Sequence, residues 1–144
     1  MVLLRVSFGV LLAAAAIAAP PLSAQGPLAL KARLSTVPVE ASTLDGLTGS
    51  GAVTATLTGN QLSISGTFQG LRTPATTARL HVAPRGLRGP AMLDLVVSGT
   101  TTGKISGDLT LTPVQADHVR RGRVYVQLQS QKAPEGNLWG WLLP

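Results

Sequence analysis

The chain has 144 residues and a formal net charge of +6, from 12 basic and 6 acidic residues. This length favours a single domain. The sequence contains no cysteine, which excludes disulfides, thiol catalysis, Cys-ligated zinc and iron–sulfur clusters.

Residues 1–24 have the layout of a secretory signal peptide. Arg5 supplies a positive charge, residues 6–19 are uncharged and apolar, and Pro20 and Pro21 end the apolar run. The run is shorter than the roughly 20 residues that a membrane span needs. We therefore predict cleavage after Ala24 and export to the periplasm or the medium. Because no cysteine is present, a lipid anchor at the new N-terminus is excluded.

Residues 25–144 are predicted to form one all-β domain with no transmembrane span. Apolar and polar residues alternate with a period of two, which is typical of half-buried strands. Threonine, serine and glutamine dominate the outward faces, which favours antiparallel sheets with one solvated side. The pattern predicts an antiparallel β-sandwich of about eight strands, centred on residues 28–34, 53–58, 62–68, 78–82, 92–97, 104–111, 124–129 and 138–142.

Local signals specify two of the connections. Gly59 and Asn60 form a two-residue link that predicts a tight hairpin. Thr112, followed by Pro113 and by Gln115, forms a capping box, and Gly122 is a typical residue after a helix C-terminus. These residues predict one short crossover helix over 113–121. The irregular residues 35–51 are predicted to run as a long loop over one edge.

The sequence resembles the chordin-type (CHRD) domain family over residues 28–143. Five segments carry the resemblance: a loop leading into the family's His-x-His strand, a Gly-x-x-Gly-Pro turn, a strand leading into the short helix, a Gly-x-x-Tyr-Val-Asn strand, and a closing strand. They are residues 70–81, 86–90, 107–112, 122–127 and 134–142. The resemblance implies a β-sandwich-like fold and no established enzymatic activity.

The chain departs from the family's pattern where a metal site is conceivable. Arg79 replaces the first histidine of His-x-His, and His81 keeps the second place. Gln129 stands where a histidine often follows the Tyr-Val-Asn strand. A guanidinium is always charged and repels a cation, so we predict no metal ligands and no cofactor. The six acidic residues are not clustered, and there is no Gly-x-Ser-x-Gly elbow, so we predict no catalytic residues.

The polar faces of three strands offer a candidate binding patch. If these strands are neighbours, their side chains form one surface of hydrogen-bonding and aromatic groups that suits a sugar ring or a protein partner. Two alternatives remain: the tryptophans face inward, or the N-terminal strand covers them. The patch candidates are Arg79, His81, Tyr125, Gln127, Gln129, Trp139 and Trp141.

Arginines cluster at two turns and attract polyanions, or they are simply solvated turn residues. Few aromatics lie between them, which disfavours nucleic acid, and an exported protein seldom meets nucleic acid. The polyanion candidates are Arg85, Arg88, Arg120, Arg121 and Arg123.

Together these observations predict an exported, non-enzymatic binding or structural module for a protein or glycan partner. The alternatives are a metal-dependent, oxidoreductase-like enzyme and a polyanion-binding protein.

Overall fold

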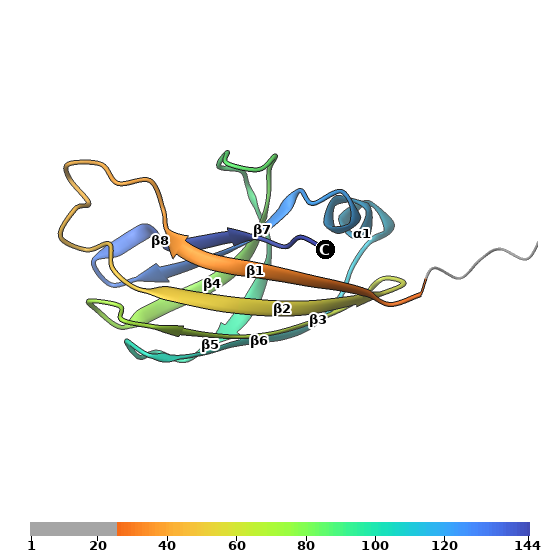
Figure 1. The fold of residues 1–144 in the computed structure, drawn as a ribbon, viewed down its shortest axis with the longest axis horizontal. Coiled ribbons are helices and arrows are strands. Elements are labelled where there is room, and N and C mark those ends of the chain that lie inside the picture. The colour runs from red at the N-terminus through yellow and green to blue at the C-terminus, as the bar shows by residue number, and fades with distance from the viewer. Residues whose placement is uncertain (1–25) are drawn as a thin grey trace, which may run out of the picture.

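The computed structural model describes residues 26–144, so the signal peptide predicted for residues 1–24 lies outside the described range. The described residues form eight antiparallel strands and one helix (Figure 1). Their bounds are β1 Leu28–Thr36, β2 Ser50–Thr58, β3 Gln61–Gln69, β4 Ala75–Val82, β5 Ala91–Val97, β6 Gly103–Thr110, α1 Pro113–Arg120, β7 Val124–Ser130 and β8 Ala133–Trp141.

The alternation in the sequence predicts which side chains face the core. Along β1, Leu30, Ala32 and Leu34 are buried, whereas Lys31 and Arg33 between them are exposed. The same alternation holds along β2 and β3. Burial of this apolar face stabilises the sheet around its main core. All the strand pairings are antiparallel, which confirms the all-β, antiparallel prediction.

The strands close into a barrel, so the prediction of a sandwich is wrong. Their order around the barrel is β1-β2-β3-β6-β5-β4-β7-β8, and β8 pairs with β1 again. β1 pairs with β2 and β8, and β5 pairs with β4 and β6. Every strand thus has a neighbour on both sides, so residues 26–144 leave no free sheet edge. Periodicity specifies the face of a strand but not its neighbours, so it could not distinguish the two architectures.

The seam between β1 and β8 depends on a very close backbone approach. A Cβ atom at Gly140 would lie 2.4 Å from the backbone oxygen of Arg33, a distance that no side-chain carbon tolerates. Ser35 pairs with Trp139 at this seam, and Lys31 forms an isolated bridge with Leu143. Glycine at position 140 therefore permits the barrel to close here.

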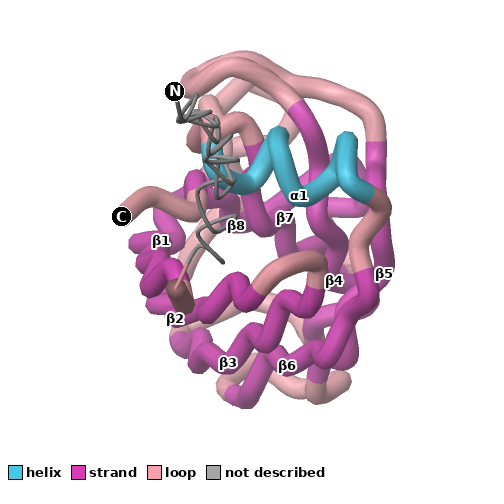
Figure 2. The backbone as a smooth tube through the Cα atoms, turned by 90° about the vertical axis from the view of Figure 1, so that its right-hand side faces the viewer, coloured by secondary structure: helices cyan, strands magenta, loops and turns pink. Residues whose placement is uncertain are grey.

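The helix closes one end of the barrel, as Figure 2 shows. Ala116 and Val119 of α1 are fully buried in the core cluster. The predicted capping box is present: the Thr112 hydroxyl accepts from the Gln115 amide, and the Gln115 side chain accepts from the Thr112 amide. The helix ends one residue earlier than predicted, at Arg120.

The other predicted connections also have counterparts. Gly59 and Asn60 link β2 to β3 in a tight hairpin, with Gly59 at a φ of 58°. Residues 37–49 form the predicted long connection, but the barrel of residues 26–144 has no open edge for it to cover. The connection begins beside the middle of β8, where the Val37 amide donates to the carbonyl of Asn137. Within the described range, no helix combines the length and hydrophobicity needed to cross a membrane.

Candidate functional site

Strands β4, β7 and β8 are neighbours, so the barrel brings the predicted patch residues together on its outer face. Gln129 pairs across the strands with Thr77. The other candidates form two rows across the three strands: His81, Tyr125 and Trp141 in the first, and Arg79, Gln127 and Trp139 in the second.

The aromatic residues of these rows form one cluster centred on Tyr125. The His81 ring stacks on Tyr125 with centroids 5.0 Å apart and an interplanar angle of 18°. Trp139 and Trp141 lie 5.7 Å and 4.7 Å from Tyr125 and 4.8 Å from one another. The cluster contains both tryptophans and the one tyrosine of the chain. It lies outside the barrel wall, since Leu138 and Leu142 of the same segment point into the core.

The loop between β4 and β5 folds back over this cluster and fixes it. The Tyr125 hydroxyl accepts from the Gly89 amide at 3.0 Å and donates to the Gly89 carbonyl at 3.3 Å. The Trp141 indole donates to the carbonyl of Ala83 at 3.1 Å. His81 Nδ1 lies 2.9 Å from the Gly89 carbonyl, and a carbonyl can only accept, so Nδ1 carries the proton in this contact.

Because of this cover, only part of the predicted patch is accessible. Tyr125 is completely buried, Gln127 is 5% exposed and Trp141 is 9% exposed. Trp139 is half-buried. The tryptophans thus point outward, as the patch requires. The sequence suggested the N-terminal strand as a possible cover for them, but in the structure the β4–β5 loop covers them. Of the two tryptophans, Trp139 is therefore the one accessible enough to meet a ligand.

The polar members of the patch have partners within the protein. Arg79 forms a 2.8 Å ion pair with Asp94 on β5, and both side chains are well exposed. Gln129 accepts from the Thr77 hydroxyl and donates to the carbonyl of Pro134 at 2.8 Å. These contacts hold Arg79 in place on β4 and Gln129 on β7.

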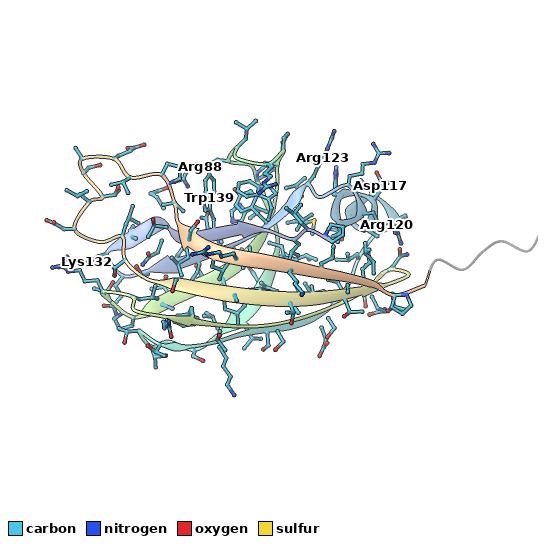
Figure 3. The ribbon with its side chains drawn as sticks, in the orientation of Figure 1. Arg88, Asp117, Arg120, Arg123, Lys132 and Trp139 are labelled. Carbon is cyan, nitrogen blue, oxygen red and sulfur yellow. The ribbon has the colours of Figure 1, made fainter. Side chains whose placement is uncertain are left out.

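Arg88 extends the cluster from the β4–β5 loop. Its guanidinium carbon lies 5.6 Å from the centre of a Trp139 ring, within the range of a cation–π contact. The same side chain donates to the carbonyl of Glu135 at 3.0 Å. Figure 3 shows Arg88 and Trp139 side by side. One predicted polyanion candidate therefore supports the aromatic cluster.

A groove opens beside the tryptophans, along the seam between β1 and β8. We call it the tryptophan groove; its volume is about 330 Å³. Two basic side chains of β1 and one of the β4–β5 loop line it together with the two indoles. Its lining includes the side chains of Lys31, Arg33, Ser35, Arg85, Trp139 and Trp141.

The register of the seam explains this composition. Ser35 pairs with Trp139, and Lys31 bridges to Leu143 in the same register, which places Arg33 opposite Trp141. Lys31 and Arg33 were not among the sequence-based candidates. They appeared only as the ordinary polar face of a strand, because nothing local indicates that this face adjoins the last strand of the chain.

The second arginine cluster lies elsewhere. Arg120 donates to the carbonyl of Gly59 at 2.8 Å, and Arg121 forms a 2.9 Å ion pair with Asp117. Arg123 is exposed. Figure 3 shows Arg120 and Arg123 near α1, away from Arg88 and Trp139. The structure thus divides the predicted polyanion candidates between two places.

Residues 26–144 contain no group of three histidine, aspartate or glutamate side chains placed to hold a metal ion. His81 Nε2 is buried and has no hydrogen-bonding partner in this part of the chain.

Fold and site together define a closed antiparallel β-barrel domain with a helix at one end and a covered aromatic cluster on its outer wall. The chain belongs to the CHRD domain family, whose match extends over residues 30–142. This match confirms the resemblance drawn from the five sequence segments. No match was found among curated proteins or among solved structures.

Proposed function

We propose that this protein is an exported, non-enzymatic CHRD-domain module that binds a protein or glycan partner in the cell envelope or outside the cell. The observation that carries the proposal is the placement of Trp139. It is half-buried, faces out of the barrel, and is held by Arg88 and Trp141 at the border of a groove.

A held aromatic side chain is well suited to recognition. Aromatic rings supply a large apolar area, and the ordering cost is small when neighbours already restrict the side chain. Trp139 contacts Tyr125 and Trp141, so its ring is oriented before any partner arrives. Export is supported by the layout of residues 1–24.

Retention of envelope components provides the test. The purified protein and two variants, Trp139→Ala and Val96→Ala, are immobilised and exposed separately to envelope polysaccharides and envelope proteins. Val96 is a suitable control because it is 69% exposed and lies on β5. We expect a component that the wild type and Val96→Ala retain and Trp139→Ala loses. Equal retention by all three proteins would contradict the proposal.

Elemental analysis tests the enzymatic alternative. The non-enzymatic proposal predicts no stoichiometric metal in the purified protein. A metal at one equivalent that disappears in His81→Ala would instead favour the metal-dependent, oxidoreductase-like alternative. His81 Nδ1 contacts the carbonyl of Gly89, so a metal ion would have to bind His81 through Nε2.

The polyanion-binding alternative uses the second arginine cluster. It predicts salt-sensitive retention on heparin that falls when Arg120, Arg121 and Arg123 are neutralised together. Two of these side chains already have partners in the protein, which favours the groove over this cluster as the binding surface.

A further inference from the structure

We propose that the tryptophan groove binds an acidic saccharide: a sugar ring packs against Trp139 while its carboxylate pairs with Arg33 and Arg85. This inference rests on the proposed function and specifies the class of ligand. The observation behind it is the meeting of three cationic side chains with two indoles in one groove.

Charge is the first argument. Lys31, Arg33 and Arg85 all line the groove, and in the described part of the chain none of its lining side chains is acidic. The basic groups therefore have no internal counter-charge within the groove itself. Arginine binds carboxylates through two parallel hydrogen bonds, and nearby positive charges increase the local concentration of anions. An anionic ligand satisfies groups that otherwise repel one another.

The aromatic wall is the second argument. Trp139 and Trp141 meet edge to face, at an interplanar angle of 66°. Arg88 contacts the Trp139 ring but lines a different hollow. Trp139 therefore borders the tryptophan groove at a place that Arg88 does not occupy. A volume of about 330 Å³ is at the lower end of the range for small-ligand sites. The groove thus offers room for a small ring beside an indole and its flanking donors.

A nucleotide ligand fits this geometry less well than a sugar. Sequence-tolerant nucleic-acid sites place successive bases on separate aromatic platforms along a charged track. Here the two indoles contact one another, and Trp141 is 9% exposed. Trp139 therefore meets the ligand, and Trp141 packs against Trp139.

The groove is also built from rigid parts. Arg33 and Ser35 lie on β1, and Trp139 and Trp141 lie on β8. The loop that carries Arg85 is tied to the wall through Gly89 and Ala83. Holding the binding groups in place before the ligand arrives lowers the entropic cost of binding.

Titration calorimetry with two matched sugars tests the charge. The probes are tri-galacturonate and its methyl ester, which has the same rings without the negative charges. The wild-type protein is expected to bind the acid at least about tenfold more tightly than the ester, because the ester lacks the charge that pairs with the two arginines. Added salt weakens binding of the acid.

Variants locate the site. Arg33→Gln and Arg85→Gln are each expected to weaken binding of the acid about tenfold. Lys104→Gln removes the same charge from an exposed position on β6 and is expected to change little. Ser35→Glu places a negative charge in the groove and is expected to abolish binding. Its matched control is Ser63→Glu, at an exposed position on β3.

Several results would overturn this inference. Equal affinity for acid and ester would show that charge plays no part, while glycan binding itself would stand. Equal weakening by Lys104→Gln and Arg33→Gln would mean that net charge, and not the groove, attracts the sugar. Tighter binding of uridine monophosphate than of tri-galacturonate would assign a different ligand class. Binding of neither sugar would refute the inference alone, because envelope retention tests the proposed function independently.

Discussion

The hydroxyl of Tyr125 bonds both backbone groups of Gly89: it accepts from the amide and donates to the carbonyl. This pair joins the start of β7 to the β4–β5 loop. A Cβ atom at Gly89 would lie 1.8 Å from the carbonyl oxygen of Val82, so only glycine allows the loop to lie this close to the strand. The loop in turn covers Trp141, brings Arg85 into the tryptophan groove and places Arg88 over the Trp139 ring.

Removing the Tyr125 hydroxyl tests whether its hydrogen bonds fix the β4–β5 loop in place. Tyr125→Phe keeps the buried ring but leaves the Gly89 amide without its partner. We expect a loss of about 1 kcal/mol in the free energy of unfolding, measured by urea denaturation. Thr54→Val removes a hydroxyl bonded at an exposed position and is expected to change stability far less. Equal stability of Tyr125→Phe and wild type would contradict this role.

Gly140 gives a second prediction, for the barrel seam. Gly140→Ala places a carbon against the Arg33 carbonyl, so β8 and β1 must separate. Overpacking of this kind costs about 1–3 kcal/mol of stability, observable as a lower midpoint of thermal unfolding. In Gly99→Ala the new carbon would lie 3.8 Å from its nearest neighbour, the Ala75 oxygen, so this control should unfold at or above the wild-type midpoint.

The helix cap gives a third prediction. Thr112→Ala removes the acceptor for the Gln115 amide and should destabilise the protein by about 1 kcal/mol. Because Ala116 and Val119 complete the core, we expect hydrogen exchange to accelerate in α1 first. Thr58→Ala, at an exposed position on β2, is the control. Uniform acceleration across all strands would show that α1 does not open separately.

Arg88 gives a fourth prediction, on the exposure of Trp139. In a Trp141→Phe background Trp139 is the one remaining tryptophan, so fluorescence reports on it alone. Arg88→Ala removes the cation beside this ring and should increase quenching by acrylamide, which is uncharged. Arg121→Ala changes the charge equally, near α1, and should leave quenching unaltered. Unchanged quenching in Arg88→Ala would mean that Arg88 does not shield the ring.

The direction of the two tryptophans could be predicted from the sequence, but their cover and the groove beside them could not. Trp139 and Trp141 alternate with Leu138 and Leu142, so their outward direction follows from the period of the strand. Their partial burial could not be predicted, because the cover comes from residues more than 40 positions earlier in the chain. The groove could not be predicted either. It needs Arg33 beside Trp141, and that pairing joins the first strand to the last.

The fold divides in the same way. Local patterns predict the strands and their inner faces, the Gly59–Asn60 hairpin and the capped helix, because alternation, turn chemistry and capping act between residues a few positions apart. Closure of the sheet has no such local signal. Closure depends on β1 pairing with β8 as well as with β2, and on the close backbone approach at Gly140. Both are contacts between segments that are distant in the sequence. Their free energy depends on tertiary packing, which a local sequence pattern does not predict.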